Sequence, residues 1–176
     1  MVAGILLAKA LFSAGHYVQT FPVFGVERRG APVEAYLRVG REKILVRSNV
    51  YTPDHVMVQD QRLLQTVDVS RGLKKGGWVI LNAPGRPEGA GVFTGFRLAC
   101  VDATAIAKKN RLGTATYPII NTAMIGAFAR VLQMPPFDLL ADTISSGIEI
   151  QPQNNIQAAR DAYDAVSLFG MVTHNR

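Results

Sequence analysis

Two hydrophobic patterns follow one another along the chain, one with a helical period and one typical of strands. Apolar residues over 121–134 recur at core-facing helical spacing, whereas residues 78–82 form a continuous apolar run, as in a strand buried on both faces. Such patterns predict helices over 1–14, 102–110, 121–134, 136–146 and 155–166, with roughly helical spacing over 62–75. They predict strands over 17–21, 33–39, 43–48, 55–59, 78–82 and 96–101.

The alternation of strands and helices indicates an α/β fold with a largely parallel, mixed sheet. The strands over 33–39 and 43–48 are predicted to pair as an antiparallel hairpin across Gly40, Arg41 and Glu42. A length of 176 residues fits a single domain, which we place at 1–167. Residues 168–176 show little periodicity and are interpreted as a C-terminal tail or a partner-contacting extension.

Composition narrows the classes of partner. The chain is 48% hydrophobic and 18% charged, so it is globular, and we expect companion proteins to cover some of its surface. The net charge of +6 is spread out, and no basic run interleaves with aromatic residues, so no nucleic-acid partner is expected. Phosphate-bearing ligands fit the positive charge. Because no apolar run is long enough to span a membrane, we expect a cytoplasmic protein without a membrane partner.

Cysteine and histidine usage argues against a metal site. The chain has one cysteine, which cannot supply the ligands of an iron–sulfur cluster or a cysteine-based zinc site. Cys100 lies in an apolar run and is interpreted as a buried small hydrophobe rather than a nucleophile. His16 and His55 are far apart and are interpreted as core or surface residues. We expect no metal bound by this chain.

The densest polar cluster lies in the loop 21–32. One of the adjacent Arg28 and Arg29 can bind a phosphate or carboxylate in bidentate fashion while the other pairs with Glu27. Gly30 permits close backbone approach. The alternative is a solvated turn, which composition alone favours.

Two further polar segments are candidates for anion contact. Asn121 or Thr122 is predicted to cap the following helix, whose free amides form an anion site; a plain helix cap is the alternative. Arg47 and Ser48 end a polar strand before Pro53, facing either ligand or water.

Several motifs, in a fixed order, resemble one family. They are F-P-x-F-G-x-E-R-R-G-A-P, R-S followed by P-D, G-L-K-x-G-G, V-D-A-T and I-N-T-A-M-I-G-A-F-A. In this order they resemble the gamma subunit, or gamma domain, of 2-oxoacid:ferredoxin oxidoreductases, which act on pyruvate, 2-oxoglutarate, 2-oxoisovalerate, indolepyruvate or arylglyoxylates. The similarity runs from the first helix to near Val166 and is specific for the family, not for a substrate.

The resemblance implies a three-layer α/β/α fold and a division of labour. Thiamine diphosphate with Mg and the 4Fe-4S clusters belong to alpha, beta and iron–sulfur subunits, and coenzyme A accepts the acyl group. Electrons pass to ferredoxin or NAD. This chain binds no cofactor by itself, is inactive alone and contains no catalytic residue.

The resemblance also implies a site on this chain. Glu27, Arg28, Arg29 and Gly30 form the functional loop, which meets a coenzyme A phosphate or a carboxylate of a neighbouring subunit. Asn121 and Thr122 shape the same region, and Arg47 and Ser48 are weaker candidates.

Two alternative functions stay open at this point. The chain is either a purely structural assembly subunit of that complex or a stand-alone α/β protein that binds a phosphate ligand. In the family a G-R-G-G-Q-G turn precedes the first helix, and this turn is absent here. We therefore expect the native subunit to carry a further N-terminal strand and turn, which its intact mass would reveal.

Overall fold

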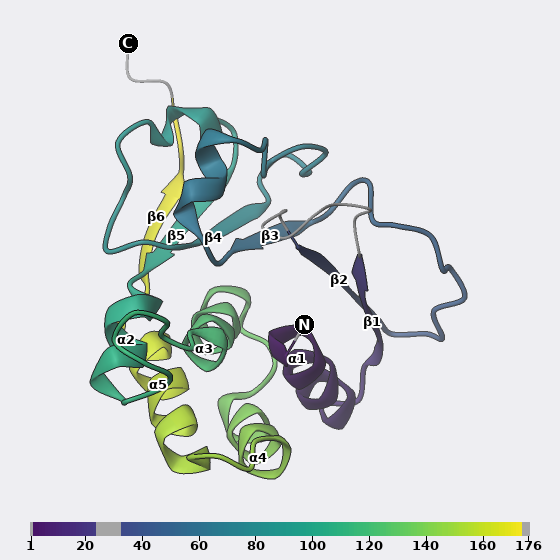
Figure 1. Ribbon diagram of the computed structural model, residues 1–176. Coiled ribbons are helices and arrows are strands. Elements are labelled where there is room, and N and C mark those ends of the chain that lie inside the picture. The colour runs from purple at the N-terminus through teal and green to yellow at the C-terminus, as the bar shows by residue number, and fades with distance from the viewer. Residues whose placement is uncertain (1, 24–32, 174–176) are drawn as a thin grey trace.

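Two separate sheets organise the protein (Figure 1), which a computed structural model describes over residues 2–23 and 33–173. The larger sheet has the order β3-β4-β5-β6, with β3, β4 and β5 parallel and β6 antiparallel to β5. Its strands are β3 (His55–Val58), β4 (Trp78–Asn82), β5 (Arg97–Val101) and β6 (Ser167–Met171). The smaller sheet is an antiparallel ribbon of β1 (Tyr17–Val23) and β2 (Glu34–Gly40). The predicted α/β class, with a parallel-rich sheet and an antiparallel hairpin, is confirmed.

Both faces of the central strands are buried, as the continuous apolar run predicted. Val79 and Leu81 of β4 enter one core, while Ile80 between them enters another. Side chains alternate across a strand, so a strand covered on both sides needs apolar residues at every position. These two cores hold β4 at the centre of the molecule.

The α-helices lie together on one side of the large sheet (Figure 1). They are α1 (Val2–Ser13), α2 (Ala103–Lys109), α3 (Asn121–Leu132), α4 (Phe137–Gly147) and α5 (Pro152–Ala165). On α3, Ala123, Met124 and Ala127 are fully buried against β4 and β5. Two short 3-10 helices, η1 (Gln61–Gln65) and η2 (Ala90–Phe93), contribute Leu63, Leu64 and Phe93 to the core on the opposite face.

Helices α3 and α5 pack with their backbones in close approach. An added Cβ on Gly126 would collide with the backbone of Ala159. The contact also contains a buried polar pair, in which the Thr122 hydroxyl donates to Asn155 Oδ1 at 3.0 Å. Small residues therefore let the two helices approach, and the hydrogen bond satisfies the polar groups that this approach buries.

Two predicted elements are wrong. Residues 43–48 form no strand, because the Arg38 side chain of β2 binds carbonyl oxygens of residues 46–49 in place of a backbone ladder. The segment 41–54, here called the arm, takes an irregular course, and β2 pairs with β1. The helical spacing over 62–75 yields only η1. The residues beyond it include Thr66, Val67 and Val69, whose β-branched side chains lower helix propensity.

The predicted tail begins with a strand. Residues 167–171 form β6 and Val172 is buried, although we interpreted 168–176 as a tail. Five residues are too few for periodicity to reveal a strand that gains its stability from pairing with β5. The limits 1–167 and 168–176 themselves stay a prediction.

No helix in the part of the chain that the structure describes is both long and apolar enough to cross a bilayer.

Candidate functional site

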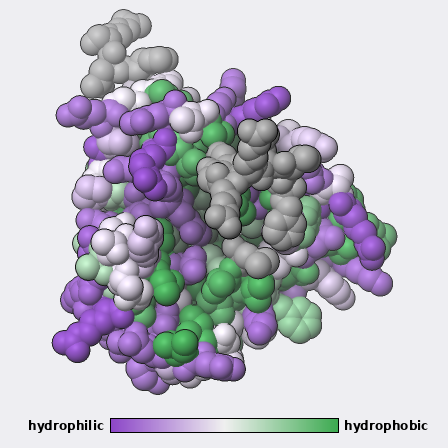
Figure 2. All heavy atoms as spheres, viewed as in Figure 1, coloured by the Kyte–Doolittle hydropathy of each residue, from purple (hydrophilic) through white to green (hydrophobic). Residues whose placement is uncertain are grey.

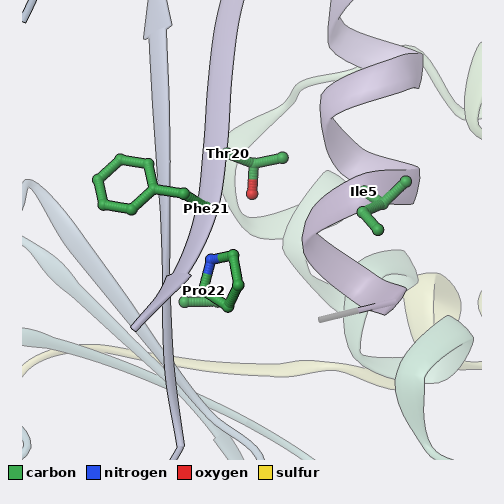
Figure 3. A pocket seen from close by; sticks show the side chains of 5 residues that line it. Ile5, Thr20, Phe21 and Pro22 are labelled. Atoms are coloured by element: carbon green, nitrogen blue, oxygen red, sulfur yellow. The ribbon is translucent and has the colours of Figure 1, made fainter. Parts of the chain in front are cut away.

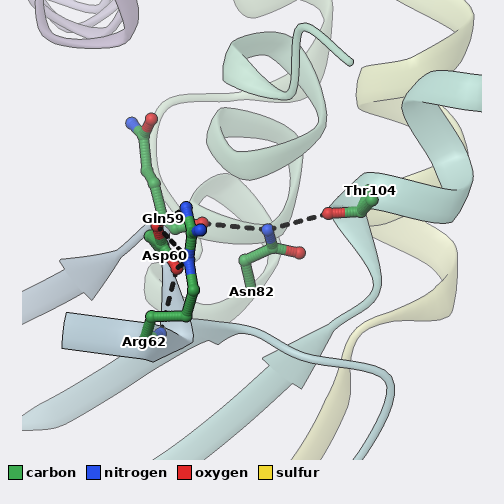
Figure 4. Close-up of polar contacts among 5 residues, drawn as sticks. All are labelled: Gln59, Asp60, Arg62, Asn82 and Thr104. Atoms are coloured by element: carbon green, nitrogen blue, oxygen red, sulfur yellow. Dashed lines mark hydrogen bonds and ion pairs between the residues drawn. The ribbon is translucent and has the colours of Figure 1, made fainter. Parts of the chain in front are cut away.

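Polar side chains gather where the parallel strands end (Figure 4). Gln59 and Asp60 follow β3, Asn82 ends β4, and Thr104 lies in α2 directly after β5; Arg62 lies in η1. We call these five residues the carboxyl-edge cluster. In open α/β sheets, ligands bind outside the carboxyl ends of the strands, so the topology marks this cluster as a candidate site.

Asn82 joins three elements at this edge. Its side-chain amide donates to the carbonyl oxygen of Gln59 at 2.9 Å and to Thr104 Oγ1 at 3.1 Å. One acceptor follows β3 and the other lies in α2, so the amide fixes the ends of β3 and β4 relative to α2. The sequence analysis missed this residue, although the signal was present: a polar residue directly follows each apolar strand.

Arg62 carries the positive charge of the cluster. Asp60 caps η1 by accepting from the Arg62 backbone N–H at 2.9 Å and binds the same residue's guanidinium at 2.6 Å. The hydrogen bonds from Arg62 lower the pKa of the Asp60 carboxyl, which stays ionised at neutral pH. The Arg62 side chain is 85% exposed, so its outer face can meet an anion from solvent.

Helix α2 has a side-chain cap, whereas helix α3 has none. Asp102 caps α2 by accepting from the Ala105 N–H at 2.8 Å. Helix α3 is instead preceded by Ile120 without a side-chain cap, so the predicted cap by Asn121 or Thr122 is wrong. Thr122 is 1% exposed and donates to Asn155, while Asn121 is half-buried. Their role in anion binding stays a prediction.

Arg47 and Ser48 are exposed on the arm, and Arg38 of β2 fixes their position. Arg38 donates to the carbonyl oxygens of Val46 at 3.4 Å, Ser48 at 2.6 Å and Asn49 at 3.2 Å. The Arg38 guanidinium therefore fixes this segment against β2, where strand pairing was predicted to do so. The sequence analysis placed Arg38 on a strand but gave it no role, because a guanidinium that binds loop carbonyls leaves no periodic signal.

The predicted functional loop falls outside the described residues, since Glu27, Arg28, Arg29 and Gly30 are not among them. By sequence the loop joins β1 to β2. Within the described residues, hydrogen bonds tie the arm to the ribbon and Thr122 to α5, so they do not link Arg47 and Ser48 with Asn121 and Thr122 directly.

Two hollows lie near these elements. Ile5, Thr20, Phe21, Pro22 and Ala35 line a small, largely apolar hollow of about 120 Å³ between α1 and the ribbon (Figure 3). A more open hollow of about 470 Å³ lies beside η1 and η2, lined by residues 64–70, 92 and 93. The first is too small for a cofactor, because ligand pockets usually span about 300–1,000 Å³.

Cys100 and His55 have structural roles. Burial raises the pKa of the Cys100 thiol to about 11, as expected for a small hydrophobe. His55 Nδ1 accepts from the Trp78 backbone N–H at 3.1 Å and thereby supports the pairing of β3 with β4. Among the described residues, no cluster of three or more His, Cys, Asp or Glu side chains is placed to hold a metal.

Known proteins resemble the chain in sequence over nearly its full length. The family described as pyruvate ferredoxin/flavodoxin oxidoreductase matches residues 1–165. Pyruvate synthase subunit PorC of Methanothermobacter marburgensis is 44% identical over 173 residues, covering 97% of this chain and 92% of that protein. The pyruvate/ketoisovalerate oxidoreductases common subunit gamma of Pyrococcus abyssi is 40% identical and covers 96% of this chain and 91% of its own length.

Solved structures share the fold. The pyruvate oxidoreductase subunit PORC of Thermotoga maritima superposes with a TM-score of 0.78 at 33% identity, covering 95% of this chain and 89% of that one. A 2-oxoglutarate:ferredoxin oxidoreductase of Magnetococcus marinus has a TM-score of 0.71 at 18% identity and covers 99% of this chain and 31% of that chain, which shows a common fold. The extent of the sequence match and the shared fold together establish that the chain belongs to the pyruvate ferredoxin/flavodoxin oxidoreductase family, among its gamma-type subunits.

Proposed function

We propose that the chain is the gamma subunit of a thiamine diphosphate-dependent 2-oxoacid:acceptor oxidoreductase and that it lines the coenzyme A region of the assembled complex. The family match over residues 1–165 is the observation that carries this proposal. The companions are alpha and beta subunits that bind thiamine diphosphate and a subunit that holds iron–sulfur clusters.

The chain's own residues support a role without redox chemistry. When bound on companion subunits, thiamine diphosphate with Mg supplies decarboxylation and the clusters carry electrons. The one cysteine is buried and its thiol is protonated at neutral pH, so it does not fit a cluster. This chain therefore binds and positions, and the 2-oxoacid is oxidised elsewhere.

Relatives suggest where substrate choice resides. The protein from Pyrococcus abyssi is named as a subunit common to pyruvate and ketoisovalerate oxidoreductases. A subunit that serves two enzymes does not select between their substrates. We extend this to the present chain and assign substrate choice to the companion subunits. The role left for this chain is contact with coenzyme A, the acyl acceptor that such enzymes share.

Arginine chemistry favours contact with coenzyme A phosphates. Arg28 and Arg29 belong to the sequence between β1 and β2, and Arg47 is exposed on the arm that follows β2. Guanidinium groups bind phosphate in bidentate fashion. The alternative is a purely structural assembly subunit whose arginines meet carboxylates of neighbours. A stand-alone phosphate-binding protein is disfavoured, because relatives matching nearly the whole chain are named as subunits.

The test is an Arg28→Gln substitution in the assembled complex. Loss of a charge-assisted hydrogen bond should raise the KM for coenzyme A by about tenfold or more while the 2-oxoacid KM stays unchanged. Arg71→Gln, an exposed arginine in the turn after η1, is the matched control and should leave both constants unchanged. Weaker assembly with an unchanged coenzyme A KM would favour the structural alternative; unchanged kinetics and assembly would reject any role for Arg28.

A further inference from the structure

The arm has a defined shape because it is anchored at its middle and near its end. At its middle, Arg38 donates to three carbonyl oxygens of residues 46–49. Near its end, the Lys74 backbone N–H donates to the Pro53 carbonyl oxygen at 3.0 Å, and Lys74 Nζ pairs with Asp54 at 2.7 Å. Gly72 has a φ of +74° and lies against the Tyr51 carbonyl, where a Cβ would collide. A segment without regular structure is thus held ready in one conformation.

The arm exposes large apolar side chains despite this anchoring. Leu45 is 78% exposed, Val46 57% and Tyr51 75%. Figure 1 shows the arm as the loop that extends beyond the ribbon, and in Figure 2 the same region of the surface mixes hydrophobic and hydrophilic residues. Single exposed apolar residues are common, but three on one anchored projection mark an interaction surface.

Positive charge surrounds these side chains. Arg41, Lys43 and Arg47 are exposed, and Glu42 is the one carboxylate among residues 41–49. Residues 41–49 of the arm therefore carry three cations and one anion. Cations flank the exposed Leu45 and Val46 along the chain, and protein–protein interfaces likewise combine apolar contacts with a polar rim.

We propose that the arm docks into a companion subunit of the same complex, placing Leu45 and Tyr51 in an apolar pocket whose rim carries carboxylates. The inference rests on the proposed function for the existence of that companion. It adds which surface of this chain binds and what chemistry receives it. A preformed arm loses little conformational entropy on binding, which favours affinity.

A second copy of this chain is a poorer occupant. A two-fold contact between two arms would bring the same cationic margins together, and like charges in contact disfavour association. An acidic rim on a different chain satisfies the same cations. Salt should therefore weaken the arm's contact by screening it.

The experiment is co-expression of the tagged chain with its companion subunits, followed by affinity purification. Leu45→Ser with Tyr51→Ser should reduce the recovered companion by about tenfold or more. The matched control is Ile150→Ser with Val92→Ser, which alters side chains that are 78% and 69% exposed but lie off the arm. The wild-type chain and both variants should unfold at the same temperature, because the altered side chains are exposed.

Each outcome bears on the proposal separately from the proposed function. Full recovery of the companion with the arm variant would overturn the docking surface and leave the subunit assignment intact. Loss of self-association in the arm variant, with companions retained, would identify a second copy as the occupant and also overturn it. Wild-type chain that recovers no companion would reject the proposed function itself.

Discussion

Gly126 is the residue on which the contact between α3 and α5 depends most directly. Its Cα faces Ala159 so closely that no side chain fits. Gly126→Ala should therefore lower the free energy of unfolding by about 3 kcal/mol, as overpacking separates the helices. Urea unfolding measures this change. Gly91→Ala is the control, since no atom lies within 4 Å of its added Cβ; equal stability of the two variants would show that the contact is looser than described.

His55 predicts a pH dependence. Burial lowers its imidazole pKa, and Arg97 and Lys74 lower it further while Asp54 opposes them. Because the folded-state pKa is depressed below the ordinary value of about 6.5, the neutral ring's contribution to stability is complete above that pH and is lost as pH falls below it. Protonation would also remove the Nδ1 acceptor used by Trp78.

The measurement compares wild-type protein with His55→Gln by urea unfolding between pH 7.5 and 5. Wild-type stability should decline more steeply below pH 6.5, by a small amount because the ring is partly exposed. Parallel curves would mean that His55 does not titrate with folding.

The local sequence predicted the roles of residues that depend on their sequence neighbours. It missed residues whose hydrogen-bond partners lie far away in the sequence. Cys100 lies in an apolar run and is buried as expected. Arg38 acts through carbonyl oxygens of residues 8 to 11 positions away, and nothing in a local window reports such contacts. Asn82 bonds the Gln59 carbonyl oxygen 23 positions away, and only its place at the end of an apolar strand marks it in the sequence. The Asn121 or Thr122 cap failed because Thr122 pairs with Asn155 in α5 instead.

At the scale of elements, β6 carries the strongest prediction. Deleting residues 167–176 removes the partner of β5 and the buried Val172, whose backbone also bonds Phe96 and Gly95. The shortened chain should lose at least about 3 kcal/mol of stability, from apolar burial and unpaired strand groups together. Thermal unfolding checks this, with a chain ending at Thr173 as control. An unchanged melting temperature would restore the interpretation of 168–176 as a tail.

Element prediction succeeded where burial was continuous or periodic over a long window. Helices α3, α4 and α5 and strands β4 and β5 follow such patterns. It failed over 43–48, whose short apolar run suits a strand, because the Arg38 side chain binds the carbonyl oxygens of this segment in place of a backbone ladder. Strand formation depends on such tertiary context and cannot be read from the segment alone.

At the scale of the molecule, the chain is a gamma-type subunit of an oxidoreductase family. Motif order identified the family, and the match over residues 1–165 confirms it. The carboxyl-edge cluster and the arm carry polar and cationic side chains at the surface. Under the proposed function, companion subunits determine the substrate and the electron acceptor, and the sequence of this chain therefore does not identify either.

The most direct measurement of the central claim is reconstitution. The companion subunits are assayed for coenzyme A-dependent oxidation of pyruvate and other 2-oxoacids with and without this chain, and the chain is assayed alone. The account predicts no turnover by the isolated chain and a large gain in coenzyme A-dependent turnover when it joins its companions. Turnover by the isolated chain, or companions that work equally well without it, would contradict the account.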